Sequence, residues 1–230
     1  FNEIWQNIGK TQNKGFEFNL NYAPVRTKDL NIDFTFNASR NWEKILELIS
    51  GEDLPNNKWF IGEPLSVLYN YEKLGVWQYG EEEDAAKYNA SVGDLKIKDQ
   101  DGDGTISARV ILGQERPKWI ASLGANIQYK NFDFSFNINS RWGYSFNLAP
   151  FNDVVLDGQR WLPAVDYWTP DNPTNNYPKA DQSNGWDTYR SANGYQKGDH
   201  IKLQDVTVGY SFDKLLSKTF IKKARFYVQL

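Results

Sequence analysis

The sequence predicts an all-β fold, a segment of a large antiparallel transmembrane β-barrel with long extracellular loops. Three observations support this prediction. Apolar and polar residues alternate over long stretches, these stretches exceed the strands of soluble sheets, and short turns alternate with very long connections. Aromatic residues make up 16% of the chain, which suits a barrel with aromatic belts on its outside. No apolar run approaches the roughly 18 residues of a membrane helix.

The first strands are predicted from period-2 alternation. Residues 16–22 alternate apolar and polar side chains, and so do residues 30–39, 119–129 and 132–138. A strand turns successive side chains to opposite faces, whereas helical spacing would scatter these apolar groups. The stretch 30–41 has 12 residues, against about 5–6 in globular sheets and about 9–11 in a strand that crosses a membrane. Its polar face suits a hydrated channel wall.

Later elements are less regular. In residues 201–212 the alternation slips at Gln204–Asp205, which predicts a β-bulge because a one-residue slip exchanges the faces. Residues 224–230 begin another strand, residues 65–78 form a strand of mixed pattern, and residues 81–88 form a short helix. An up-and-down count does not close between Asn41 and Lys118 unless residues 43–49 make a further crossing. The sequence leaves that point open.

The connections are of two kinds. Residues 22–30 make a short turn, and Lys130–Asn131 makes a tight hairpin. Residues 41–64, 79–118 and 143–199 are long excursions. Outer-membrane barrels combine short periplasmic turns with longer extracellular loops, so the excursions are expected at the cell surface.

Composition excludes several classes of function. The formal net charge is −3, and Lys and Arg are scattered, so a nucleic-acid partner is not expected. The chain has no Cys and one His, His200, which excludes thiol chemistry and multi-histidine metal centres. Phe1 starts in the middle of a pattern without a signal peptide. We expect the chain to be a piece of a longer protein.

One motif has the spacing of a calcium loop. Asp99, Asp101 and Asp103 stand at alternate positions before Gly104, and Thr105 follows as a carbonyl donor. Hard oxygen ligands at this spacing converge on Ca²⁺ in EF-hand-like loops. The twelfth position is Val110 instead of the acid that normally closes the site. A bound Ca²⁺ that rigidifies the loop and an acidic turn without metal both remain open.

The loop between Trp161 and Tyr195 is the expected recognition surface, because exposed aromatics among polar residues suit sugar stacking or a protein partner. Packing of the loop against itself is the competing interpretation. Nearby carboxylates such as Asp166 could serve a glycosidase, but no nucleophile motif or phosphate loop accompanies them, and we expect no enzyme. The candidate contact residues are Trp161, Tyr167, Trp168, Trp186 and Tyr189.

Several motifs then follow one another in a fixed order. They are NKGFE at 13–17, GEPL to GVWQ between 62 and 78, VGDLK at 92–96 with the acidic loop and RP at 116–117, YKNFDFS at 129–135, YWTPDNPT at 167–174, and IKLQDVTVGY at 201–210. Together they resemble the SusC/RagA-like TonB-dependent outer-membrane transporters over essentially the whole chain. Ser107–Arg109 is shorter than the family pattern after the acidic loop, which puts the cation site in doubt.

The resemblance implies a 22-stranded barrel, about the size of the plugged outer-membrane transporters. Residues 1–230 would belong to its C-terminal half, and the plug domain, the TonB box and the last strands would lie outside this chain. It also implies a multi-pass protein in outer-membrane lipid, a SusD-like surface lipoprotein as partner, and oligosaccharide or peptide substrates imported with energy delivered through TonB.

Two other classes of protein stay open. One is a secreted calcium-binding β-sandwich that binds carbohydrate, and the other is a glycoside hydrolase. A sandwich would bury the apolar face of its sheet against a second sheet. A barrel would instead turn Phe16, Phe34, Phe36 and Phe134 toward lipid. The substrate and the oligomeric state are not predicted.

Overall fold

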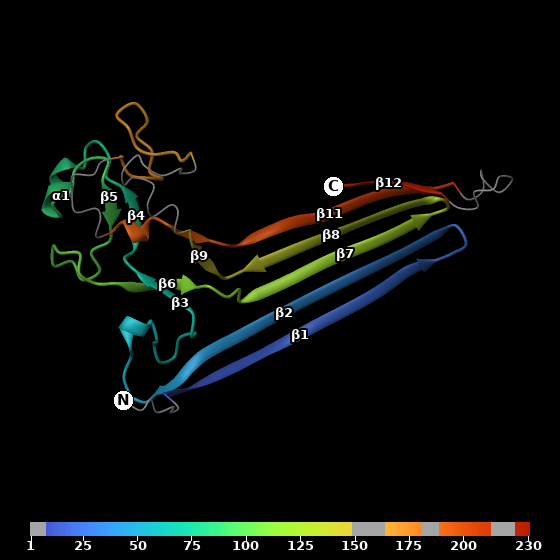
Figure 1. Ribbon diagram of the computed structural model, residues 1–230, viewed down its shortest axis with the longest axis horizontal. Helices are drawn as coiled ribbons and strands as arrows, with labels where there is room; N and C mark the ends of the chain where they lie inside the picture. Colours follow the sequence, from blue (N-terminus) through green and yellow to red (C-terminus); the bar gives the residue numbers. More distant parts are fainter. Residues whose placement is uncertain (1–7, 149–163, 181–188, 213–223) are drawn as a thin grey trace, which may run out of the picture.

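The computed structural model describes residues 8–148, 164–180, 189–212 and 224–230. Its main feature is a six-stranded antiparallel sheet in the order β1-β2-β7-β8-β11-β12, which forms the long diagonal arm of Figure 1. The fold is all-β, as predicted. The strands of the sheet are β1 (Gly9–Arg26), β2 (Leu30–Leu48), β7 (Trp119–Tyr129), β8 (Phe132–Trp142), β11 (His200–Ser211) and β12 (Arg225–Gln229).

Two tight turns lie together at one end of this sheet (Figure 1). Between β1 and β2, the Thr27 hydroxyl donates to the Leu30 carbonyl at 3.0 Å and accepts from the Leu30 amide at 2.9 Å. Between β7 and β8, Lys130 has a φ of 54°. Its amide donates to the Asp29 carbonyl at 2.6 Å, so the two turns contact each other.

The long connections gather at the opposite end of the sheet and form what we call the loop region (Figure 1). Three small two-stranded sheets are built there, β3-β6, β4-β5 and β9-β10. Elements of this region are β3 (Val67–Asn70), β4 (Lys73–Val76), β5 (Leu95–Ile97), β6 (Val110–Gln114), β9 (Ser145–Asn147), β10 (Tyr195–Lys197), the helix α1 (Glu82–Lys87), and the 3-10 helices η1 (Pro55–Asn57) and η3 (Arg190–Ala192).

The structure settles the strand count between β2 and β7. These strands pair along an unbroken register from Leu30 with Tyr129 to Arg40 with Trp119, which leaves no place for a strand between them. Residues 43–48 extend β2 and pair with the start of β1. They therefore form no further crossing strand of their own. Residues 65–78 form two short strands, β3 and β4, instead of one, because each pairs with a different neighbour within the loop region.

Other predicted details are confirmed. The helix predicted at residues 81–88 is α1. The bulge predicted at Gln204–Asp205 is a register shift between Leu203 and Asp205 in the pairing of β11 with β8. Because the shift restores the apolar phase, Val206 pairs with Phe136 and Val208 with Phe134.

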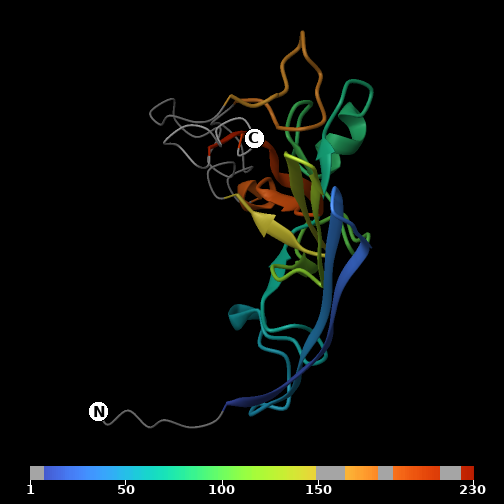
Figure 2. The ribbon, with the colours of Figure 1, turned by 90° about the vertical axis from the view of Figure 1, so that its right-hand side faces the viewer.

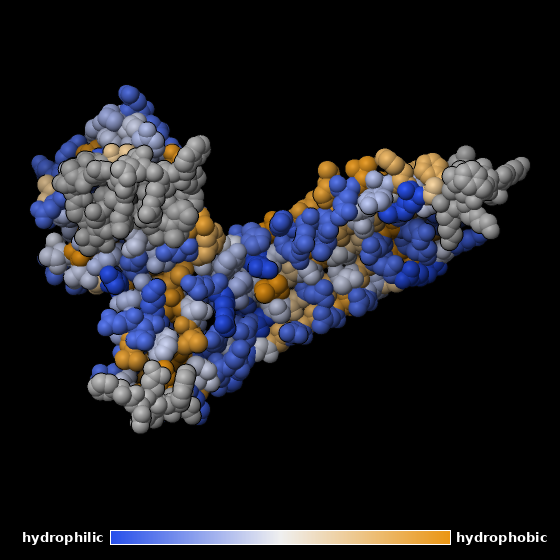
Figure 3. Space-filling view, viewed as in Figure 1, coloured by the Kyte–Doolittle hydropathy of each residue, from blue (hydrophilic) through white to orange (hydrophobic). Residues whose placement is uncertain are grey.

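The sheet has one apolar and one polar face. In one row across four strands, Phe34 pairs with Ala125, Ala125 with Phe136, and Phe136 with Val206. The next row is polar and includes Thr35, Asn137 and Asp205. Hydrophilic residues predominate on the face of the arm that Figure 3 shows.

No second sheet covers the apolar face among the described residues. The sheet is a single curved layer in the view turned by 90° (Figure 2). Phe16, Phe18 and Leu20 are 46%, 48% and 47% exposed. A β-sandwich would bury these side chains, so the sandwich alternative is wrong.

Aromatic residues mark both ends of the apolar face. Phe16, Trp119 and Trp142 lie in a row near the loop region, whereas Tyr129 and Phe132 pair near the tight turns. From Trp119 to Tyr129 a strand rises about 34 Å, and a tilt of about 35–45° reduces this to roughly 25 Å. That height equals the apolar band of outer-membrane barrels, which aromatic girdles also flank.

The buried core lies in the loop region instead of under the sheet. Val67, Val76, Trp77 and Ile97 are almost fully buried there, and Tyr71, Leu95, Ile97 and Ala192 form one cluster. None of the helices in the described part of the chain has the length and apolarity needed to span a membrane.

The two faces generate a first prediction. Phe34→Arg should lower the free energy of unfolding of the whole protein in phospholipid vesicles by about 2–4 kcal/mol, because it places a charge on the apolar face, which the sequence predicts to meet lipid, near mid-membrane. Denaturant titration measures this loss. The matched control Thr35→Arg, on the opposite face, should cost distinctly less. Equal losses for the two variants would contradict the assignment of the faces.

Candidate functional site

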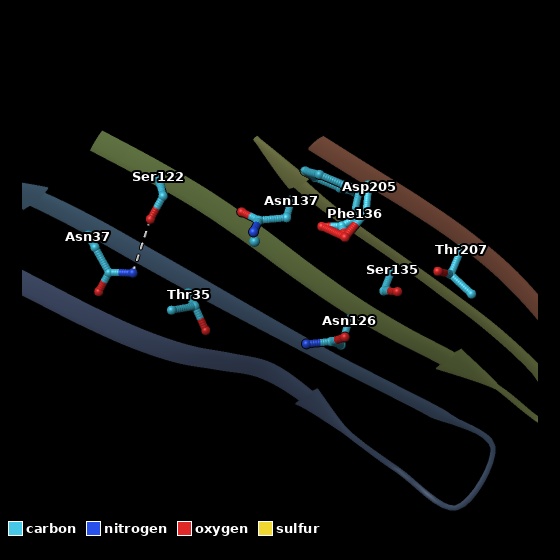
Figure 4. Close-up of a pocket in the computed structure, with 10 residues that line it drawn as sticks. Thr35, Asn37, Ser122, Asn126, Ser135, Phe136, Asn137, Asp205 and Thr207 are labelled. Carbon is cyan, nitrogen blue, oxygen red and sulfur yellow. Dashed lines mark hydrogen bonds between the residues drawn. The ribbon is translucent and has the colours of Figure 1, made fainter. Parts of the chain in front are cut away.

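The polar face contains a shallow pocket in the middle of the sheet. Figure 4 shows side chains of β2, β7, β8 and β11 around it, and its volume is about 320 Å³. Asn37 Nδ2 donates to Ser122 Oγ at 3.1 Å, and Asn126, Asn137 and Asp205 also line the pocket. Amides and hydroxyls both donate and accept hydrogen bonds, so this wall suits water and polar solutes.

An ion pair near the tight turns, on the same face, joins β12 with β8 across the strand between them, β11. Arg225 of β12 donates from Nε to Asp133 Oδ1 of β8 at 3.0 Å and from a second guanidinium nitrogen to Oδ2 at 2.5 Å. The pair passes over Gly209 of β11, where an added Cβ would lie 2.5 Å from both carboxylate oxygens. Glycine at this position therefore leaves the space that the ion pair occupies.

In the loop region, Lys73 holds distant segments together. Its Nζ donates to Asn193 Oδ1 at 2.7 Å and to the backbone carbonyl of Asn176, and it lies 5.3 Å from the ring centroid of Tyr177. Burial disfavours the charged form, which lowers the pKa of Lys73 to about 8. The sequence carried no signal for this role.

A second polar centre lies beside Lys73. Asn70 Nδ2 donates to Ser191 Oγ at 2.9 Å and to the Tyr195 hydroxyl at 3.3 Å, and its Oδ1 accepts from the Tyr71 amide. A cavity of about 390 Å³ opens next to these groups, and Glu72, Lys73, Tyr195 and Lys197 are among its lining residues. It offers both charges and hydroxyls to a polar ligand.

The acidic loop has the local geometry of a cation-binding turn. Asp99 accepts from the Gly102 and Gly104 amides at 2.9 Å each, and Asp103 Oδ1 accepts from the Thr105 amide and hydroxyl at 2.7 Å each. The Gly104 amide contributes most to holding the pKa of Asp99 below its usual value. Oxygen atoms of Asp99, Asp101 and Asp103 lie within 4.8 Å of one another.

The donor set fits a hard cation in part. Three carboxylates converge, and oxygen is the ligand that Ca²⁺ prefers. Val110 starts β6 and pairs with Asn70, and its side chain supplies no ligand that would complete the coordination of a cation. Within the described ranges, no fourth Asp, Glu, His or Cys joins the cluster. The cation at this loop stays a prediction.

The predicted contact aromatics differ in exposure. Tyr167 is 45% exposed, whereas Trp168 is 6% exposed and packs 5.5 Å from the ring of Tyr79. Tyr189 meets the ring of Tyr71 edge-on at 5.0 Å. Trp161 and Trp186 lie outside the described residues. Tyr167 is therefore the best placed of the described candidates to touch a ligand or partner, and that role stays a prediction.

Asp166 organises the turn that carries Tyr167. Its carboxylate accepts from the Asn172 and Asn176 amides at 2.8 Å each and from the Thr174 hydroxyl. These bonds, the Thr174 contribution being largest, lower the pKa of Asp166. A glycosidase acid needs a raised pKa to hold its proton, so the shift of Asp166 runs opposite to that of a proton donor, and the observed role of its carboxylate is to hold this turn.

Comparisons with known proteins point to one family. No family model matches the chain. The chain is 34% identical over 229 residues to TonB-dependent receptor P26 of Formosa agariphila, covering 92% of this chain and 23% of that receptor. It is 26% identical over 230 residues to TonB-dependent receptor SusC of Bacteroides thetaiotaomicron, covering 93% of this chain and 22% of SusC.

Solved structures show the same fold. The structure of the RagAB peptide transporter matches 100% of this chain and 26% of that chain, with a TM-score of 0.67 and 21% identity. The chain spans about a quarter of the length of the proteins it matches. The resemblance drawn from the ordered motifs is confirmed.

The half-buried Lys73 generates a second prediction. Between about pH 8 and 10.5 the unfolded chain holds a proton on Lys73 that the folded chain has lost, so this residue makes the stability of the loop region rise with pH, by at most about 3 kcal/mol. Lys73→Met should remove this rise, measured as the thermal midpoint by tryptophan fluorescence across that window. The exposed Lys98→Met serves as control. Parallel pH profiles for the wild type and Lys73→Met would contradict it.

Proposed function

We propose that this chain, which belongs to the barrel region of the TonB-dependent receptors, is part of a transporter that imports oligosaccharides or peptides across the outer membrane. The observation that carries the proposal is the single six-stranded sheet, with one apolar face, one polar face and the whole loop region at one end. A sheet of this kind separates lipid from a hydrated interior. Two of its relatives bear the names TonB-dependent receptor P26 and SusC.

In such a transporter each part of the chain has a defined position relative to the membrane. The polar face, with the pocket around Asn37 and Asn137, lines the channel and offers hydrogen bonds to a passing solute. The tight turns face the periplasm, and the loop region faces the cell surface. The outer edges of β1 and β12 pair with further strands of the same barrel, because unpaired backbone groups are not tolerated in lipid. Residues 1–230 belong to the C-terminal half of that barrel.

The loop region is where the partners meet. A SusD-like surface lipoprotein closes over it, and substrate passes between the two proteins. Tyr167 offers an exposed ring to the passing substrate. The cavity beside Lys73 offers side chains of both charges. The plug and the TonB box supply the coupling to the inner membrane. No bond is made or broken in the substrate, so the protein is not an enzyme.

Ca²⁺ at the acidic loop would rigidify this surface. Asp99, Asp101 and Asp103 would supply carboxylate oxygens, and Thr105 its backbone carbonyl. The remaining coordination positions would be filled by water, because the side chain of Val110 carries no oxygen ligand. A site with few protein charges is expected to bind weakly and to saturate at extracellular calcium levels.

Uptake by intact cells tests the transport function. Deleting the gene for the whole protein should abolish energy-dependent uptake of labelled oligosaccharides or of labelled peptides, and deleting tonB should do the same. The complemented strain is the control. Unchanged uptake of both substrate classes in the tonB strain, or a loss of extracellular hydrolysis instead of uptake, would contradict the proposal.

Tyr167→Ala should raise the substrate concentration for half-maximal uptake several-fold without lowering the maximal rate. An exposed ring stacks on a ligand for about 1 kcal/mol, and the variant loses only that contact. Tyr22→Ala, which removes an exposed tyrosine from the apolar face, is the matched control. If both variants behave alike, Tyr167 has no contact role.

Asp101→Asn should weaken Ca²⁺ binding by the whole protein about tenfold or more, because it removes one of three converging carboxylates. Equilibrium dialysis with radioactive Ca²⁺ measures this change. Asp84→Asn removes an exposed acid that pairs with Lys87 in α1 and should leave binding intact. Absence of stoichiometric binding in the wild type would identify the loop as an acidic turn without metal.

A further inference from the structure

One cation lies among the aromatic residues of the apolar face. The guanidinium carbon of Arg40 is 4.3 Å from the ring centroid of Trp42 and 4.7 Å from that of Trp119. Phe16 contacts both indoles, at 6.0 and 5.7 Å between ring centroids. Rings on two sides hold the guanidinium plane in one place, because each indole face attracts a cation.

The pairing register confirms which face Arg40 occupies. It pairs with Phe16 on one side and with Trp119 on the other. Period-2 alternation places it on the same side as Phe34, Phe36 and Ala38. It therefore stands in the aromatic row near the loop region, where the hydrocarbon of a membrane gives way to headgroups.

Arg40 lacks an acceptor within the described part of the protein. Its Nε is buried without a hydrogen-bond partner, and none of the ion pairs between described residues includes it. A guanidinium carries five N–H donors, and leaving them unmet at a partly desolvated position is costly. An anionic acceptor from outside the chain would satisfy them.

Two more cations share this side of the sheet. Lys14 pairs with Trp42, and Lys44 pairs with Gln12. Alternation places Lys14 on the side of Phe16, and Lys44 on the side of Trp42 and Arg40. Glu17 and Glu43 fall on the opposite side by the same rule, and Glu43 is paired there with Arg116 at 3.2 Å. Glu47 lies beyond the register shift between Lys10 and Thr11, where it pairs with Lys10. Between that register shift and the aromatic row, the charged residues on the apolar side, Lys14, Arg40 and Lys44, are all positive.

We propose that Arg40, with Lys14 and Lys44, binds the phosphate of an anionic lipid in the leaflet next to the loop region. The planar guanidinium matches two phosphate oxygens at once, the two lysines add charge above it, and Trp42 and Trp119 border the acyl chains. The choice of leaflet rests on the proposed function, which puts the loop region at the cell surface. The lipid then anchors the barrel at a fixed height.

The test uses the whole protein, purified in non-ionic detergent and stripped of lipid. Native mass spectrometry follows the binding of diphosphoryl lipid A and of the same lipid after removal of its phosphates. The wild type should bind the phosphorylated lipid, and R40Q should bind it at least about tenfold more weakly. R40K, which keeps the charge but loses the planar fork, should lie between the two.

The matched control is R141Q. Arg141 pairs with Ile120, one residue from the aromatic row, and falls on the polar face, so its loss should leave lipid binding unchanged. A shift in gel mobility on boiling, recorded for each variant, shows that the barrel is folded. If R40Q does not fold, the binding of phosphorylated lipid A by R40K is compared with that by R141Q. Weaker binding by R40K supports the site, and equal binding contradicts it.

Four results would overturn the lipid site. They are equal binding of the phosphorylated and dephosphorylated lipids, equal binding by the wild type and R40Q, equal losses in R40Q and R141Q, and full displacement of the lipid by excess inorganic phosphate, which would identify a phosphate site. In each case a heat-modifiable, transport-active protein leaves the proposed function standing. A wild type that is neither heat-modifiable nor located in the outer membrane would overturn both proposals.

Discussion

In the proposed outer-membrane barrel the structure depends on one constraint, that every backbone donor and acceptor inside a lipid bilayer has to be paired within the protein. Strand β7 shows the solution. It is bonded to β2 along one side and to β8 along the other through all of Trp119–Tyr129. Once the backbone is satisfied this way, successive side chains turn to opposite environments, and one face becomes apolar while the other carries amides and hydroxyls. The length of the strands, the length of the turns and the position of the two aromatic rows follow from the same requirement.

A different force organises the loop region, where water surrounds the chain. Apolar side chains such as Val76, Trp77 and Ile97 are buried there, because removing them from water is favourable. Polar groups then fix the register of segments that are distant in sequence, as when Lys73 reaches Asn193 and Asn70 reaches Ser191. The acidic loop stands at the exposed side of this assembly.

Much of the sheet could be predicted from the sequence, because alternation reports a two-sided environment directly. Even the bulge near Asp205 was visible as a change of phase. The part of β2 nearest the loop region could not be predicted, because residues 43–48 carry no simple alternation. They pair with the polar start of β1, above the proposed membrane level. The loop contacts were also out of reach. Lys73 sits in an ordinary strand sequence, and its partners lie more than a hundred residues away, so no local pattern marks it.

The central claim is that the odd-numbered residues of β7 face lipid and the even-numbered ones face a hydrated channel. It is tested most directly by single cysteines introduced at each position from 119 to 129, since this chain has no native cysteine. Each would carry a spin label, and collision rates with oxygen and with a water-soluble nickel complex would be measured in vesicles. The account predicts high oxygen access at positions 121, 123, 125 and 127 and high nickel access at the even positions. Uniform nickel access at both sets of positions would contradict it.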